Sequence, residues 1–146
     1  MVPMGEIIGR IFPILPKHLE RIFAGKNVFC KFVGKGRPRL SPEMKILFYS
    51  SRGTYEVVGE ATIDSLEYLS PQEVMQKYGS RLFISAEELD GYTRKRSRPP
   101  NKELMVAVLK QIRRYKKPYK LKKPVTMAGL SLTDKVYREI VSQAGL

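Results

Sequence analysis

The distribution of apolar residues along the chain predicts strands and short helices. Residues 44–50 are apolar at nearly every position, which is typical of a strand buried on both faces. Residues 54–69 follow after the turn 51–53 and alternate between two faces. The alternation changes phase at Ser65–Leu66, which predicts a β-bulge, and bulges allow a sheet to curl. We therefore expect these two strands to form the middle of a small, strongly bent sheet.

Further strands are predicted around this pair. Pro13 places the end of the first of them at a sheet edge, and Pro124 favours a short edge strand for the last. These strands are expected at residues 5–14, 27–33, 104–115 and 125–132.

Helices are predicted where apolar residues recur at helical spacing behind a start signal. Ser70 and Ser85 are each followed three residues later by a glutamate, which is the pattern of a capping box. Pro16 suits the first turn of another helix, on which we interpret His18 as a surface residue. The helices are expected near residues 16–23, 71–78 and 86–92, and after Thr133.

The chain is predicted to form one domain. A length of 146 residues suits a single core, no segment repeats another, and no linker is long enough to divide the chain. The clearest irregular stretch is expected at residues 93–102, because Pro99 and Pro100 exclude regular structure there. We therefore expect an α+β fold spanning residues 1–146.

The composition excludes several classes of protein. The 42% of hydrophobic residues argues against general disorder, while no apolar run is long enough to span a membrane and no signal peptide is evident. A single cysteine, Cys30, and a single histidine, His18, predict no disulfide, no metal site and no cofactor. We expect a cytoplasmic protein without membrane contact.

Charge gives the strongest indication of a partner. The chain has 27 Lys and Arg against 14 Asp and Glu, for a net charge of +13. Residues 1–50 hold 9 basic and 3 acidic side chains, residues 51–90 hold 3 and 8, and residues 91–146 hold 15 and 3. Such segregation builds a field that attracts a polyanion, of which nucleic acid is the most obvious.

Three segments concentrate these cations. Residues 34–39 form a Gly- and Pro-containing loop with Lys35, Arg37 and Arg39, and residues 93–102 carry five cations. Residues 110–123 place eight cations around Tyr115 and Tyr119 without an acid. Cations hold phosphates and tyrosine faces stack on bases, so this mixture is typical of single-stranded RNA binding. Alternatively, the tyrosines pack against the sheet.

The order of elements resembles the PUA/ASCH-like group of small β-barrels, and in particular an archaeal family of uncharacterised PUA-like proteins. The resemblance lies in PKHLERIFAGKNVFCKF, KILFYSSRG, VVGEATIDSLEYL, KYGSRLFISAEEL and VAVLKQIRRYKKP. It implies an open, mixed β-pseudobarrel of about five to seven strands with three to four short flanking helices. It also implies an RNA-associated role.

The same resemblance suggests a cleft beside the first helix. ASCH-type proteins commonly have a Gly-x-Lys motif at the end of that helix, and Gly25-Lys26 looks like a version one residue shorter. Lys26 would match the cleft lysine and Lys31 a later basic residue. Some relatives hydrolyse an acylated nucleoside with lysine, threonine and glutamate, but Phe29 stands where the threonine or acid is expected. Glu60 could supply a carboxylate.

The leading hypothesis is an RNA-binding domain that contacts structured RNA, such as tRNA or rRNA, with a role in RNA modification beside a modifying enzyme. If about four to six phosphates are neutralised, a plot of the logarithm of the binding constant against the logarithm of the salt concentration should have a slope of roughly −3 to −5. The predicted RNA contacts are Lys26, Lys31, Lys35, Arg37, Arg39, Lys45, Arg52, Arg94, Lys95, Arg96, Arg98, Lys110, Arg113, Arg114 and Tyr115.

Two other functions are compatible with the sequence. The first is an enzyme, a hydrolase or modifying enzyme on a modified nucleoside, with Lys26 and Glu60 as its catalytic pair. The second is a protein-interaction subunit whose basic surface binds an acidic or ribosomal partner. The sequence leaves the oligomeric state, monomer or dimer, undecided.

Overall fold

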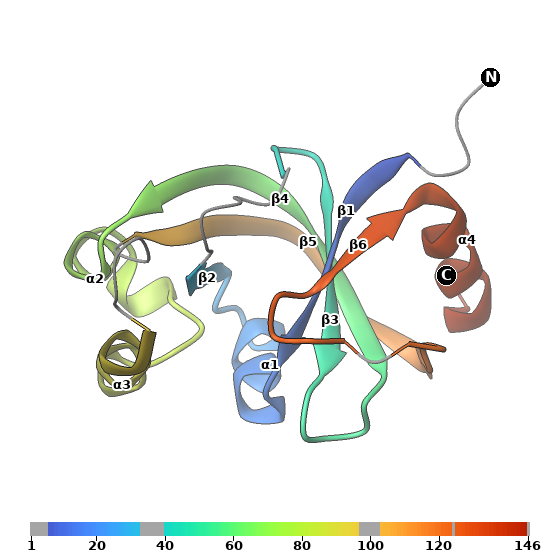
Figure 1. Cartoon of the computed structure of the whole chain (residues 1–146), viewed down its shortest axis with the longest axis horizontal. Coiled ribbons are helices and arrows are strands. Elements are labelled where there is room, and N and C mark those ends of the chain that lie inside the picture. Colours follow the sequence, from blue (N-terminus) through green and yellow to red (C-terminus); the bar gives the residue numbers. More distant parts are fainter. Residues whose placement is uncertain (1–5, 33–39, 97–102, 124, 146) are drawn as a thin grey trace.

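The described part of the chain folds into one bent sheet with four α-helices around it (Figure 1). The computed structural model describes residues 6–32, 40–96, 103–123 and 125–145, with the backbone alone at residues 93–96. In chain order the elements are β1 (Ile7–Ile14), α1 (Pro16–Phe23), β2 (Val28–Phe32), β3 (Lys45–Ser50), β4 (Val57–Leu69), α2 (Pro71–Tyr78), the 3-10 turn η1 (Gly79–Arg81), α3 (Ala86–Arg96), β5 (Leu104–Tyr119), β6 (Leu130–Thr133) and α4 (Asp134–Ala144).

The sheet has the strand order β2-β5-β4-β3-β1-β6. The β1–β3 pair is parallel, and the other four pairs are antiparallel. β4 and β5 arch over α2 and α3 and then cross beneath β1 and β3 (Figure 1). The two end strands β2 and β6 do not pair, so the sheet is curled but open. The predicted open mixed pseudobarrel with about five to seven strands and three to four helices is confirmed.

Two hydrophobic cores lie on the two faces of this sheet. Ile46 and Phe48 of β3 point into a core shared with α1, α2 and α3, whereas Leu47 and Tyr49 point into a core closed by α4. Successive side chains of a strand point to opposite faces, so a strand between two cores must be apolar throughout. The prediction of a strand buried on both faces is confirmed for residues 46–50, whereas Met44 and Lys45 at its start are half-buried.

The bend of the sheet follows from bulges in the β4–β5 ladder. Ile63 pairs with Leu109 but Ser65 pairs with Val108, so Asp64 is the extra residue of a bulge. This is the position at which the apolar alternation changes phase, and the predicted bulge is confirmed. A second shift lies nearby, where Gln111 adopts a φ of 52°.

Gly59 of β4 allows helix α1 to pack closely against the strands. A Cβ at Gly59 of β4 would lie 2.7 Å from the ring of Phe23 and 2.5 Å from the carbonyl oxygen of Arg113, so a larger residue would push the helix away. The inner face of the helix is formed by the buried Leu19 and Ile22. The helix begins at Pro16, as predicted.

Both predicted capping boxes are present. The Ser70 hydroxyl accepts from the backbone N–H of Glu73 at 3.2 Å, and the Glu73 carboxylate accepts from the N–H of Ser70 at 3.0 Å. Ser85 and Glu88 make the equivalent bonds at 3.1 and 2.8 Å. The Thr133 hydroxyl caps α4 by accepting from the N–H of Val136.

Three predicted boundaries are corrected. The expectation of irregular structure from residue 93 is wrong, because α3 continues to Arg96 once its capping box has started it. The second central strand begins at Val57 and not at residue 54, because a turn with left-handed residues Arg52 and Tyr55 precedes it. The last strand is β6, which begins only at Leu130.

Candidate nucleic-acid interface

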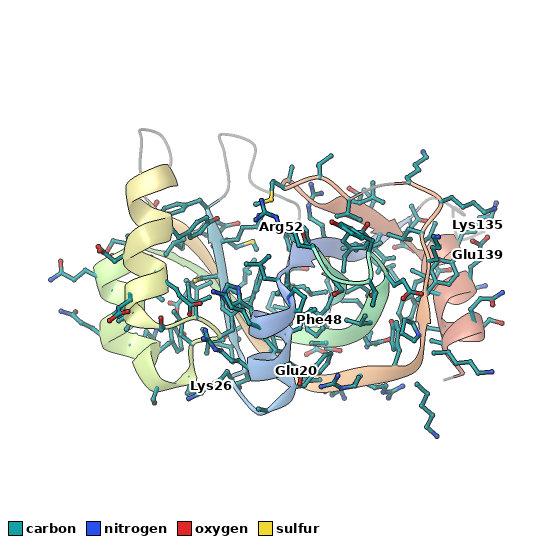
Figure 2. All side chains as sticks on the ribbon, turned by 90° about the horizontal axis from the view of Figure 1, so that it is seen from below. Glu20, Lys26, Phe48, Arg52, Lys135 and Glu139 are labelled. Carbon is teal, nitrogen blue, oxygen red and sulfur yellow. The ribbon has the colours of Figure 1, made fainter. Side chains whose placement is uncertain are left out.

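Six exposed cations follow one another on the second half of β5 and just after it. We call them the β5 strip: Arg113, Lys116, Lys117, Lys120, Lys122 and Lys123. Within the described residues none of the six forms an ion pair with a carboxylate. In Figure 2 this part of β5 runs along one side of the molecule and then turns beside α4. Unneutralised ammonium and guanidinium groups in such a row suit a chain of phosphates.

The strip lies at a free strand edge. β2 pairs with β5 from Leu104 to Val108, and Leu109 still donates its backbone N–H to Asn27. Beyond Leu109, the described residues of β5 pair as a strand with β4 only. Lysines at such an edge also discourage pairing with another sheet. The edge therefore presents charge rather than a template for a further strand.

Other predicted contacts are already engaged within the protein. Lys110 pairs with Glu43, and the guanidinium of Arg114 makes two hydrogen bonds with the Glu20 carboxylate at 3.1 and 3.2 Å while it lies over the Phe23 ring. Lys45 donates to the hydroxyl of Thr62 at 2.9 Å. Lys45, Lys110 and Arg114 are therefore held by other side chains of the protein, unlike the cations of the β5 strip.

Tyr115 is a correction to the predicted interface. Its side chain is only 3% exposed and lies in the α4-side core, so its ring face is not available to stack on a base. Its hydroxyl donates to Glu60 at 3.0 Å. Burial, reinforced by the Glu60 carboxylate, raises the pKa of Tyr115, so the phenol stays neutral. The alternative, in which this tyrosine packs against the sheet, is the one observed.

Lys26 and Glu60 lie in different surroundings. Lys26 is exposed, and its Nζ donates to the carbonyl oxygen of Ser80 at 2.6 Å. Glu60 is 3% exposed and accepts from Tyr115 and Tyr137, with Lys45 at 3.4 Å. Among the described contacts, none joins the proposed catalytic pair.

A cavity of about 200 Å³ lies beside the first half of α1. Its wall is mostly apolar and aromatic, with the polar groups concentrated at His18, Lys31 and Glu88. Among its lining residues are His18, Phe29, Cys30, Lys31, Phe83 and Tyr92. Of Lys26 and Lys31, which the resemblance placed at a cleft beside this helix, Lys31 lines the cavity and Lys26 does not. Lys26 and Arg52 lie on the two sides of α1 (Figure 2).

His18 is not the surface residue expected from the sequence. Its side chain is 15% exposed, its ring lies edge-on to Phe83 at 5.4 Å between centroids, and its Nε2 lies 3.0 Å from the Glu88 carboxylate. Burial lowers the pKa of His18 despite the opposing effect of Glu88. The helical spacing of Leu15, Leu19 and Ile22 gave no sign of this, because the partner Glu88 is 70 residues away.

Glu88 is held by four donors. Burial raises its pKa, but hydrogen bonds from the Ser85 backbone and from Arg21, His18 and Lys17 outweigh that effect and leave the pKa well below its usual range. The Lys17 ammonium lies 3.1 Å from the carboxylate. Glu88 is therefore ionised at neutral pH, and its carboxylate orients His18 at the cavity wall.

Some predicted residues lie outside the part that the structure describes. These are Lys35, Arg37, Arg39 and Arg98, together with the side chains of Arg94, Lys95 and Arg96. Among the described residues, no cluster of three or more His, Cys, Asp or Glu side chains is suited to a metal ion. Over the same residues, no helix has the length and apolar character to cross a membrane.

The fold is similar to those of two solved structures. The crystal structure of ASCH from Zymomonas mobilis superposes with a TM-score of 0.75 at 16% identity, over 92% of this chain and 94% of that one. The N-terminal domain of Staphylothermus marinus McrB gives a TM-score of 0.60 at 16% identity, over 97% and 99% of the two chains. At such identities the likeness concerns the fold.

The family follows from sequence comparison. Residues 7–134 match the family described as "Domain of unknown function (DUF365)", and the chain belongs to that family. A protein of Methanocaldococcus jannaschii, described as uncharacterized, is 32% identical over 111 residues, which are 68% of this chain and 99% of that protein. The predicted relationship to an archaeal uncharacterised family with a PUA/ASCH-like fold is confirmed.

Proposed function

We propose that the protein is an RNA-binding domain that holds RNA by its phosphates on the β5 strip. The observation that carries this proposal is the row of exposed cations without carboxylate partners, in a protein whose other described cations include several held by acids or carbonyls. The PUA/ASCH-like fold favours RNA over DNA, because that resemblance implies an RNA-associated role. A structured target such as tRNA or rRNA belongs to the same proposal.

The contact is expected to be largely independent of sequence. Lysine and arginine contacts to phosphates fix position but carry no base code. With Tyr115 buried and Tyr119 only partly exposed against the α4-side core, the strip offers little of the stacking platform that the sequence suggested. Different RNAs of equal length and structure should therefore bind the strip with similar affinity.

The proposal is tested by fluorescence anisotropy with a labelled tRNA and a single-stranded DNA of equal charge. A strip variant, Lys116→Gln/Lys117→Gln/Lys120→Gln, removes three phosphate contacts. At roughly 0.5–1 kcal/mol for each exposed contact, its affinity should fall about tenfold or more. Unchanged affinity would remove the strip from the interface.

A charge-matched control makes this test specific. Lys26→Gln/Lys77→Gln/Arg81→Gln removes the same charge from the side of the molecule formed by α2, η1 and the end of α1. This variant should retain wild-type affinity, because Lys26, Lys77 and Arg81 already contact Ser80, Glu67 and Asn27. If both variants lose affinity equally, only net charge matters and the strip is not the site.

An acidic protein or the ribosome is the competing partner for a basic surface. Nuclease treatment of natively purified protein separates the two. Loss of co-purifying material under RNase supports an RNA partner, whereas survival of a protein companion supports an interaction subunit. For the nucleoside-hydrolase alternative, the separate surroundings of Lys26 and Glu60 offer no catalytic pair.

A further inference from the structure

The turn between β3 and β4 presents an aromatic ring to solvent. The side chain of Tyr55 is 55% exposed, whereas every other phenylalanine and tyrosine whose side chain the structure describes is buried or half-buried. A ring left in water forgoes the free energy that its burial would contribute. The fold therefore does not use Tyr55 to build either hydrophobic core.

The backbone at this turn is also unfavourable for a large side chain. Tyr55 has a φ of 58° and Arg52 a φ of 59°, both in the left-handed region that glycine or asparagine adopts more easily. The hairpin fixes this conformation, because the N–H of Tyr55 donates to the Ser50 carbonyl at 3.0 Å and the N–H of Ser50 donates to the Glu56 carbonyl at 2.8 Å. Residues held in such conformations are concentrated where proteins contact ligands.

The exposed ring is supported from one side. Its centroid lies 6.4 Å from that of Tyr49, with 56° between the ring planes, which is within the usual range of aromatic pairs. Tyr49 is buried in the α4-side core, so it gives the Tyr55 ring a firm base. Neither tyrosine lines the cavity beside α1. A supported aromatic ring that is open to solvent suits the stacking of a nucleic-acid base.

The register of β4 against β5 places this ring beside the end of the β5 strip. Val57 pairs with Tyr119 in the antiparallel ladder, so the residues before Val57 and the residues after Tyr119 leave the sheet at the same end. Two residues of chain span at most about 7 Å and paired strands lie about 5 Å apart, which puts the backbone of Tyr55 within about 12 Å of that of Tyr119. Lys120 of the strip follows directly. In Figure 1 the β3–β4 turn projects at the bottom of the view.

A further cation lies on the same turn. Arg52 is exposed and, within the described residues, forms no ion pair with a carboxylate. It therefore has the same character as the cations of the β5 strip. An exposed aromatic ring between cations is the combination by which proteins hold single-stranded nucleic acid.

We infer that Tyr55 is a stacking platform for an unpaired RNA base, whose neighbouring phosphates lie on the β5 strip. The inference rests on the proposed function, and it adds the base contact that the strip itself does not offer. Every base has a π-face, so the ring distinguishes unpaired from paired nucleotides rather than one base from another. The ligand class is therefore a single-stranded or looped segment of RNA.

The inference is tested with a labelled oligouridylate and an abasic oligonucleotide of equal length, which carries the same phosphates without bases. Loss of one base stack corresponds to a roughly 5- to 150-fold loss of affinity, so the wild-type protein should bind the oligouridylate more tightly by such a factor. Tyr55→Asn, which suits the left-handed backbone, should bind both oligonucleotides with the affinity of the wild type for the abasic one. Tyr55→Phe keeps the ring and should bind like the wild type.

Fluorescence gives a second readout of stacking. The chain contains no tryptophan, so Tyr55→Trp introduces a fluorophore at this position alone. Its emission should be quenched when the oligouridylate saturates the protein and should stay unchanged with the abasic oligonucleotide.

The outcomes separate the ring from the strip. Equal wild-type affinity for the two oligonucleotides, an unaltered oligouridylate affinity in Tyr55→Asn, or unquenched Tyr55→Trp in the saturated complex would overturn the role of Tyr55 and leave the strip intact. If the wild-type protein binds neither oligonucleotide, the proposed function and this inference are both overturned.

Discussion

The carboxylate of Glu60 on β4 accepts a bifurcated hydrogen bond from the hydroxyl of Tyr137 on α4, at 3.0 Å to Oε1 and 2.9 Å to Oε2. This contact joins the last helix to the centre of the sheet across 77 residues of sequence. Tyr115 donates to the same carboxylate, and Lys45 lies 3.4 Å from it. A buried acid with three partners is stabilising as a group and costly to leave incomplete.

Tyr137→Phe should therefore destabilise the protein. Hydrogen bonds to charged groups contribute about 1.5–3 kcal/mol, so a loss of about 1–2 kcal/mol is expected because Tyr115 and Lys45 remain. The free energy of unfolding, measured by urea denaturation, checks this. Tyr55→Phe is the matched control. Because Tyr55 is 55% exposed, removal of its hydroxyl should change the free energy of unfolding little. Equal free energies of unfolding for the two variants would show that the Tyr137–Glu60 hydrogen bond contributes nothing to stability.

Cys30 should be unreactive in the folded protein. Burial raises the pKa of its thiol to about 12, and the thiolate is the reactive form. An aromatic disulfide reagent at pH 8 should label essentially no thiol in native protein and one thiol per chain in denaturant. Rapid labelling of the native protein would show that Cys30 is open to solvent.

Stability should fall in acid partly through Glu88. The folded-state pKa of Glu88 lies below its ordinary value of 4.5, so its stabilising contribution is complete above about pH 4.5 and is lost as the pH falls below it. His18 adds to the same trend from about pH 6.5 downward, because its lowered pKa means that unfolding binds a proton.

The Glu88 contribution is isolated by comparing unfolding free energies at pH 7, 5 and 3. Glu88→Gln should be less stable than wild type at pH 7, and the difference should shrink by pH 3. Glu87→Gln serves as a control on the exposed side of the same helix. A constant difference between Glu88→Gln and wild type at all three pH values would contradict the assignment.

The sequence predicted those features that depend on neighbouring residues. The capping boxes at Ser70 and Ser85 and the bulge near Asp64 follow from spacing within a few positions. The sequence did not predict the burial of Tyr115. A tyrosine between lysines shows the same local pattern whether its ring packs in the core or lies on the protein surface. Only the register of β5 against β4 and the packing of α4 decide that.

The candidate site was predicted in outline and missed in detail. A cleft beside the first helix was expected from resemblance, and a cavity lies there, but its polar centre is His18 and Glu88. That pair joins two helices 70 residues apart, so no short motif reveals it. The division of cations into paired and unpaired likewise depends on where Glu20 and Glu43 lie in the fold.

Binding of RNA by the β5 strip is tested most directly by the salt dependence of affinity in wild type and strip variant. For four to six phosphates at about 0.7 to 0.9 each, the values for single strands and for duplex, the wild-type log–log slope should be roughly −3 to −5. Removing Lys116, Lys117 and Lys120 should reduce its magnitude by about 2, whereas the control without Lys26, Lys77 and Arg81 should keep the wild-type slope. A flat wild-type slope, or a strip variant with the wild-type slope, would contradict the proposal.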